Sequence, residues 1–468
     1  MTAIRFSRTG APMSGQGVIG SLGLAVIGTY VIVLAWAMQN VSYDFWGAML
    51  LFPLLAAISV PVVWRICRDD PEPMPGLMAL ALVAKLLAAL PRYFVIFQVY
   101  GGAADAPRYH AAGADIAERF HAGQLSLFSL IPHSQGTKFI EELTGFVYTF
   151  LGPTKVGGFM FFSWMGFWGL FLMYRAALIG FPEIHARRYA YILFFAPSML
   201  FWPSSLGKES WLMLALGVTF YGAARFLSQM RGGIPLAALG SVMSGYVRPH
   251  VTAIVVVSLG VAALFQRSAS RTEKFSPTRK LIGIAVVAIG ISIAVTQAAR
   301  FLGTDKSNGV SAVTNAFDIV HGQTTGGGSA IDTETPNSPL QFPRAFVSVM
   351  FRPTLIEVRN GTSLIAALET TALFVLFAAS WQSLKELPYW LFRRPYMLFC
   401  LLYVGIFAFA WSSIGNLGII ARQRVLAWPF AFVFVALPSA ADRRRTAKLL
   451  SADAVDRPAL GRLASAHR

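Results

Sequence analysis

Long apolar stretches recur along this 468-residue chain, and they constrain its fold more than any other feature. A helix that crosses the hydrocarbon core of a bilayer needs about 20 mostly apolar residues. The first such stretch, GVIGSLGLAVIGTYVIVLAWAM, occupies residues 17–38 and already meets that length. Only 13% of all residues are charged, whereas soluble domains carry about 25%. The sequence therefore predicts an all-α fold, a polytopic bundle of transmembrane helices.

About twelve spans are predicted from the apolar runs. Their approximate bounds are 17–38, 45–64, 74–99, 155–178, 188–203, 209–228, 233–247, 250–266, 279–298, 362–383, 395–412 and 418–438. Three of them, 188–203, 233–247 and 250–266, are short for a complete crossing. We expect residues 1–438 to form the bundle and the basic residues 439–468 to form a disordered cytoplasmic tail.

Basic residues in the short loops set the orientation. With 39 Lys and Arg against 22 Asp and Glu, the formal net charge is +17. Many of these cations fall on one side of the predicted topology, namely Arg5, Arg8, Arg65, Arg68, Arg187, Arg188, Arg225, Arg231, Arg267, Arg271, Lys274, Arg279, Lys280, Lys385, Arg393, Arg394, Arg443, Arg444 and Arg445. The positive-inside rule then predicts a multi-pass protein of the cell membrane with both termini in the cytoplasm. Because the cations lie in membrane loops, nucleic acid is not an expected partner.

Two long segments, 100–154 and 299–361, lie on the outer side in this topology. The first contains DAPRYHAAGADIAERF and KFIEELTGFVYTFLG, which predict amphipathic helices at the membrane surface. Basic residues are disfavoured on the outer side, so those found there need a reason. The ionisable residues that we single out on this side are Asp105, Arg108, His110, Lys208, Glu209, Arg248, His250, Arg352, Arg359, Arg422 and Arg424.

The charges of the last span are the most informative of this set. Arg422 and Arg424 lie a few residues inside the outer end of an apolar run, where each charge costs about 2.5–3.5 kcal/mol on insertion scales. One reading is structural, as ion-pair partners of Glu209 or Glu357. The other is functional, because a guanidinium group can grip a phosphate with two hydrogen bonds. A cluster of Arg and Lys at the outer lipid boundary suits a lipid with an anionic head group.

Candidate acid–base groups lie in the first outer segment. Asp105 is the first choice as general base on an acceptor hydroxyl, and His110 could assist proton transfer. The structural alternatives are a helix N-cap for Asp105 and a solvated loop position for His110. In the third predicted span, Lys85 and Arg92 are seven residues apart and share a helix face. We expect Lys85 to pair or line a cavity, and Arg92 to reach the outer interface.

Motifs for common cofactors are absent from the sequence. It contains two cysteines, Cys67 and Cys400, and no P-loop, HExxH pair or cysteine cluster. The sequence requires no cofactor. A divalent cation could bind an acidic residue together with His110, although the spacing is not diagnostic.

One family resemblance follows from the order of these motifs. A DAxxYHxxG segment on an outer loop, an amphipathic stretch, and spans linked by FAPSMLFWPSSLGKESWLML resemble the integral-membrane glycosyltransferases of the GT-C superfamily. The resemblance covers about residues 74–266. It implies a sugar donor linked to polyprenyl phosphate, Asp105 as the acidic residue that activates the acceptor, and outer-face Arg and Lys as phosphate ligands. The family places its acidic loop after the first span, whereas Asp105 follows the third.

A second resemblance shifts the weight to other residues. The late outer loop and the number of spans are similar to those of O-antigen polymerases and ligases. In such a protein Arg248, His250, Arg352 and Arg359 would matter more than Asp105. The polymer would then be extended on the outer face.

The leading hypothesis is transfer of a sugar from a lipid-phosphate donor to a cell-envelope glycan, lipid or protein. Two other classes stay open: a transporter or lipid flippase, for which Lys85 is the best argument, and a scaffold of a cell-envelope assembly. The transferase hypothesis makes a structural prediction. Asp105, Lys208, Arg248 and Arg422 should line one cavity that opens to the outer leaflet.

Overall fold

The computed structural model describes residues 15–70, 74–265 and 339–445, with the single positions 288, 292, 296, 322, 324, 330, 331 and 448. These residues form helices, and the strand pairing among them is one isolated bridge between Ala330 and Asn416. The all-α prediction is thus confirmed for the described part of the chain. The span predicted at 279–298 lies outside the continuous described stretches.

Six helices of the described residues are long and apolar enough to cross a membrane. They are Gly23–Asn40 within α1 (Gly15–Asn40), α2 (Tyr43–Cys67), the unit Pro75–Val99, α7 (Lys155–Gly180), α10 (Lys208–Leu227) and α16 (Gly361–Ala379). A seventh results if Leu417–Leu426 and Trp428–Ala436, which meet at an angle of 62°, form one broken span. The predicted count of about twelve is therefore not confirmed.

Short helices account for the difference. The run predicted as one span at 188–203 is interrupted at Ala196, between α8 (Ala186–Phe195) and α9 (Pro197–Phe201). Pro197 forces this break, because a residue before proline is pushed out of the helical conformation. The runs predicted at 233–247, 250–266 and 395–412 form helices of 15–17 residues: α11 (Gly233–Val247), α12 (Pro249–Leu264) and α19 (Pro395–Trp411). At 1.5 Å per residue they measure about 24 Å, less than a bilayer core of about 30 Å.

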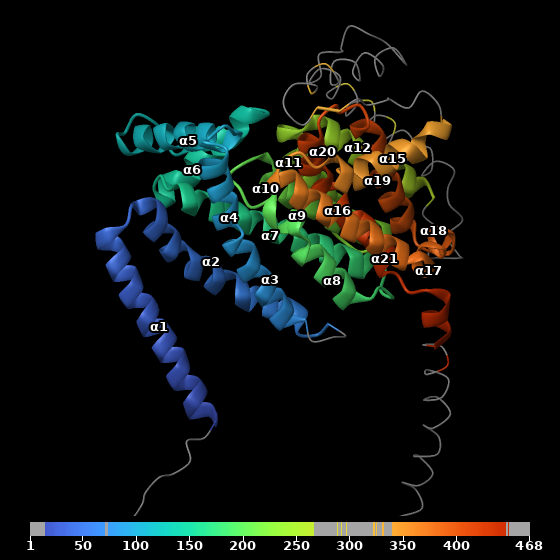
Figure 1. The fold of residues 1–468 in the computed structure, drawn as a ribbon, viewed down its shortest axis with the longest axis horizontal. Coiled ribbons are helices and arrows are strands. Elements are labelled where there is room, and N and C mark those ends of the chain that lie inside the picture. Colours follow the sequence, from blue (N-terminus) through green and yellow to red (C-terminus); the bar gives the residue numbers. More distant parts are fainter. Residues whose placement is uncertain are drawn as a thin grey trace, which may run out of the picture.

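The unit Pro75–Val99 is composite and leads into a surface pair of helices. It consists of α3 (Pro75–Leu87), α4 (Ala89–Phe94) and the π-helix η1 (Val95–Val99). The predicted amphipathic helices follow as α5 (Asp105–His121) and α6 (Thr137–Leu151), with the 3₁₀ turn η2 (Phe128–Leu130) between them. Figure 1 shows α5 and α6 side by side at the upper left. Gly113 permits this contact, because a Cβ there would lie 2.5 Å from the Thr144 side chain.

The described residues after 338 are mostly helical, including part of the predicted second outer loop. Within the predicted outer loop 299–361, the described residues form η3 (Pro339–Gln341), α15 (Phe342–Phe351) and η4 (Leu355–Glu357). After α16 come α17 (Trp381–Leu384), α18 (Leu387–Arg393) and, beyond α19, α20 (Leu417–Gln423), η5 (Arg424–Leu426) and α21 (Trp428–Ala436). Residues 440–445 of the predicted disordered tail are helical. Most of that tail lies outside the described residues.

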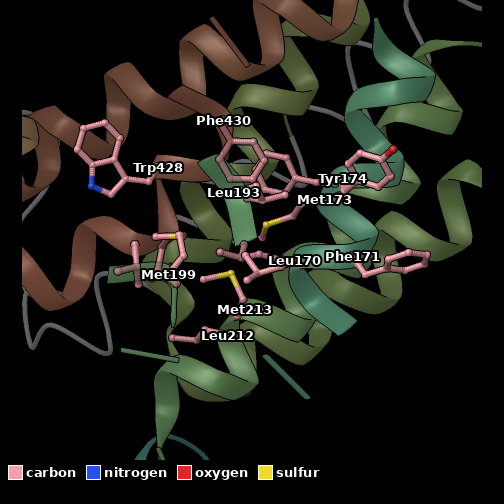
Figure 2. Close-up of a cluster of buried hydrophobic side chains, with 14 of the residues drawn as sticks. Leu170, Phe171, Met173, Tyr174, Leu193, Met199, Leu212, Met213, Trp428 and Phe430 are labelled. Atoms are coloured by element: carbon pink, nitrogen blue, oxygen red, sulfur yellow. The ribbon is translucent and has the colours of Figure 1, made fainter. Parts of the chain in front are cut away.

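Helices α7 and α10 form the centre of the bundle. Their backbones meet at Gly169 and Gly217, where a Cβ on Gly169 would lie 2.3 Å from the Met213 carbonyl oxygen. Small residues that allow such close approach are typical of helix packing in membranes. Figure 2 shows the apolar side chains around this contact. They come from α7, α8, α9, α10 and α21, and include Leu170, Met173, Leu193, Met199, Leu212, Met213 and Phe430.

Candidate functional site

A buried carboxylate organises the candidate site. Glu209, the second residue of α10, is only 6% exposed. Nη2 of Arg248 donates a hydrogen bond to Glu209 Oε1 at 3.1 Å. Nε of Arg422 lies 3.0 Å from the same oxygen and forms an ion pair with it. A carboxylate buried this deeply needs such partners, because an unpaired buried charge is costly.

Three breaks in helical structure bring these partners together. Glu209 lies in the first turn of α10, two residues after the N-cap residue Gly207, and Arg248 occupies the junction between α11 and α12. Pro249 creates that junction, since the residue before proline cannot continue a helix. Arg422 lies on α20, just before the bend of the last span. The neighbouring Gln423 accepts a hydrogen bond from Arg248 Nη1 through its side-chain oxygen.

Asp105 lies at the rim of the same group. It is the first residue of α5, and the N-cap position belongs to Ala104, so the N-cap alternative is wrong. Oδ2 of Asp105 lies 3.7 Å from Nη1 of Arg422, and the Asp105 side chain is 59% exposed. A carboxylate is favourable at this helix N-terminus. Its exposure leaves it open to a second partner.

Lys208 completes the group as an extra cation. Its ammonium group donates to the hydroxyl of Thr137 at 2.7 Å, and it forms no ion pair with a carboxylate among the described residues. We call Asp105, Lys208, Glu209, Arg248 and Arg422 the Glu209 cluster. Three cations face two carboxylates in it, which leaves one excess positive charge. The cluster can therefore attract an anion.

The structure brings the four residues of the sequence prediction together, but two neighbours of Asp105 lie elsewhere. Nε of Arg108 donates to Glu141 at 2.7 Å, and the Arg108 side chain is 68% exposed. His110 Nδ1 lies 2.9 Å from the Tyr148 hydroxyl oxygen. His110 therefore contacts α6 rather than the Glu209 cluster, and its role in proton transfer stays a prediction.

The remaining predicted residues form other contacts. Arg352 pairs with Glu357, with Nε 2.6 Å from Oε1, and its carbonyl oxygen accepts a hydrogen bond from buried Arg424. Arg359 is exposed just before α16, and the ring of His250 lies 5.6 Å from that of Trp411. The expectation that Arg422 forms an ion pair with Glu209 is thus confirmed. The same expectation is wrong for Arg424, which donates a hydrogen bond to a backbone carbonyl group and does not pair with Glu357.

A cavity appears in another part of the fold. It lies at the C-terminal end of α10, and its lining includes Leu227, Gln229, Phe265, Phe392 and Leu398. A common cavity at the Glu209 cluster stays a prediction.

Lys85 has structural partners. Its ammonium group is buried and donates to the carbonyl oxygens of Met199 at 2.6 Å and Leu200 at 3.1 Å, near the end of α9. At the start of α9, the Glu369 carboxylate accepts a hydrogen bond from the Ser198 amide at 2.8 Å. A carboxylate at the start and an ammonium group at the end of a helix both complement its dipole. These contacts hold the broken helix that leads into the loop before α10.

The site also contains residues that sequence reasoning missed or misplaced. Arg92 was expected at the interface but is 6% exposed, with its guanidinium carbon 4.7 Å from the ring centroids of Phe201 and Trp202. Tyr109 is 1% exposed, and Gln423 binds Arg248. The sequence could have indicated Tyr109, because it lies four residues after Asp105 and so shares the same face of the helix.

No group of three His, Cys, Asp or Glu side chains in the described residues could hold a metal ion. The chain matches no protein-family model, no curated protein and no solved structure. The functional argument therefore rests on the described geometry and on the sequence.

The position of His110 predicts how stability depends on pH. Burial lowers the pKa of His110 below its usual range, so below that range the unfolded chain binds a proton that the folded chain excludes. Stability is then retained at neutral pH and lost as the pH falls, by at most about 1.4 kcal/mol per pH unit. A thermal-unfolding series between pH 7.5 and 5 should show this slope, and H110N should reduce it. Replacing the exposed His121 by asparagine should leave the slope unchanged; equal slopes in all three proteins would contradict the assignment.

Proposed function

We propose that this protein is a membrane glycosyltransferase that takes a sugar from a polyprenyl-phosphate donor and transfers it to a cell-envelope acceptor. The observation that carries the proposal is the Glu209 cluster, which combines excess positive charge with an exposed carboxylate at one end of the helix bundle. The cations suit a phosphate group, and the long apolar helices suit a lipid tail. The resemblance to the GT-C superfamily in the DAxxYHxxG segment supports the same activity.

The geometry suggests how the groups divide the work. Asp105, exposed at the rim, accepts the proton of the acceptor hydroxyl as that oxygen attacks the anomeric carbon of the sugar. The bond between that carbon and the phosphate oxygen breaks, and its electron pair leaves with the phosphate. The phosphate thereby changes from a singly charged diester to a monoester with additional negative charge. Lys208, Arg248 and Arg422 stabilise this developing charge, which is the principal electrostatic task in such a transfer.

The proposed orientation places the site at the outer side of the cell membrane. The start of α1 and residues 440–445 lie in the lower half of Figure 1, whereas α5 and α20 lie in its upper half. A cytoplasmic location of both termini is what the positive-inside rule predicts from the loop charges of the sequence.

A direct assay tests the proposal. Purified protein in lipid nanodiscs, supplied with a labelled polyprenyl-phosphate sugar and a cell-envelope extract, should yield a labelled acceptor and free polyprenyl phosphate. K208M should raise the apparent KM for the donor by about 10- to 100-fold, the value of one hydrogen bond to a charged group. K138M is the matched control, because Lys138 follows Thr137 but is exposed. Absence of transfer from several such donors would contradict the proposal.

A transporter is the second candidate, since two helices are broken. The chain bends by 62° between Leu417–Leu426 and Trp428–Ala436, and it breaks again between α8 and α9. Discontinuous helices are typical of binding sites in secondary transporters. Movement of an unaltered lipid-linked sugar across proteoliposomes would favour this function. A ladder of products in the transfer assay would instead indicate a polymerase.

A further inference from the structure

Arg92 has a buried guanidinium group whose N–H donors are not all satisfied within the described structure. It lies on α4, and its guanidinium group contacts Phe201 and Trp202, each ring centroid being 4.7 Å from the guanidinium carbon. Such cation–π contacts stabilise the charge but leave the in-plane N–H groups available. Nε and Nη1 are buried and have no hydrogen-bond partner among the described residues. Buried donors are nearly always satisfied in native structures, so this pair requires a partner.

Tyr109 presents a second unsatisfied group. Its side chain is 1% exposed, and its hydroxyl oxygen is buried without a hydrogen-bond partner in the part of the chain that the structure describes. The hydroxyl belongs to α5, while Arg92 belongs to the membrane unit below it. Two independent elements therefore each contribute a buried polar group that lacks a partner.

Both groups border the Glu209 cluster. Glu209 and Arg422 are the charged side chains that act most strongly on Arg92, and Asp105, Glu209, Arg422 and Arg248 all act on Tyr109. The loop before α10 connects them physically, because it begins at Phe201 and Trp202 and ends at Gly207. A Cβ added to Gly207 would lie 3.6 Å from Glu209 Oε2 and 3.9 Å from the Tyr109 ring.

We propose that Arg92 and Tyr109 form an inner subsite for a phosphate group, on the bundle side of the Glu209 cluster. Nε and Nη1 of Arg92 donate to two phosphate oxygens, as a planar guanidinium group does, and the Tyr109 hydroxyl donates to one. This inference rests on the proposed function and adds to it the residues that bind the donor from within the bundle. Arg92 supplies a second excess positive charge beside the first one.

A binding experiment separates this subsite from the catalytic proposal. Full-length protein in nanodiscs is titrated with labelled farnesyl phosphate, and farnesol and inorganic phosphate serve as competitors. Y109F and R92Q should each weaken farnesyl phosphate binding by about 10- to 100-fold. R119Q, which alters an exposed arginine on α5, is the matched control.

The stability of Y109F distinguishes binding from structure. The hydroxyl has no partner in the described structure, so its removal should leave the thermal midpoint of the empty protein unchanged while Kd rises. A lowered midpoint with an unchanged Kd would overturn the subsite, as would wild-type affinity in both variants. Neither result would affect the proposed transfer reaction.

The competitors distinguish the sources of the phosphate. Preference for farnesyl phosphate over both farnesol and inorganic phosphate supports a lipid head group. Equal affinity for inorganic phosphate would keep the anion subsite and contradict the lipid donor of the proposed function. If farnesyl phosphate binds no better than farnesol, both proposals fail.

Discussion

The E209Q variant is expected to lose about 3–5 kcal/mol of folding free energy, which is the usual cost of removing one partner from a buried ion pair. Glutamine keeps the size of the side chain, so the change is one of charge. Arg248 is as buried as Glu209 and would lose its carboxylate partner, keeping the hydrogen bond to the Gln423 oxygen. Arg422 is 31% exposed and keeps Asp105, so most of the loss arises from Arg248. The thermal midpoint of nanodisc-embedded protein measures the effect.

A pair on the surface provides the control for E209Q. Glu141 holds Arg108 in an ion pair of similar length, but the Arg108 side chain is largely exposed. Exposed pairs contribute about 0–1 kcal/mol, so E141Q should barely change the midpoint. If E209Q and E141Q unfold at the same temperature, Glu209 is not the organising charge of the cluster.

A double variant identifies the origin of the loss. In E209Q/R248M the uncompensated guanidinium group is gone together with its partner. Replacing both members of a buried pair is usually far less costly than removing one, so the double variant should be more stable than E209Q alone. Additive losses would show that each side chain stabilises the fold independently.

The long spans could be predicted because their signal is local. The apolar runs at 45–64, 155–178 and 209–228 appear as α2, α7 and α10 with bounds shifted by only a few residues. Twenty apolar residues need lipid or a protein core wherever they occur. For the runs that form α11 and α12, the sequence does not show whether they are spans, because whether a helix of 15 or 16 residues crosses a bilayer depends on its neighbours.

The sequence could predict those contacts of the site that follow from the need of a charged group for a partner. A carboxylate and a guanidinium group in apolar surroundings must find partners, which made the pairing of Glu209 with Arg422 foreseeable. The position of His110 could also have been derived: five residues after Asp105, it lies about 140° around the helix, whereas Tyr109 lies on the same face. The aromatic contacts of Arg92 could not be derived, since Phe201 and Trp202 lie at a helix break far away in the sequence.

The D105N variant is expected to lose transfer activity by about 10²- to 10⁴-fold, the usual contribution of a general base. Its fold should be unaffected, because Asp105 is exposed and Arg422 keeps Glu209 as a partner. Loss of its favourable position at the start of α5 costs about 0.3–1 kcal/mol. D115N provides the control, since Asp115 lies on the same helix in an exposed pair with Arg119. Full activity of D105N would remove Asp105 from the reaction.

The kinetics of D105N also separate base catalysis from charge balance. If Asp105 only tempers the positive charge of Arg422, its neutralisation strengthens phosphate binding and lowers KM without a large change in kcat. If Asp105 is the base, kcat falls while KM for the donor is retained. An acceptor with a thiol in place of the hydroxyl makes the distinction independent of binding. At pH 9 such a thiol is largely ionised, so it needs no base, and D105N should transfer sugar to it nearly as fast as the native protein does.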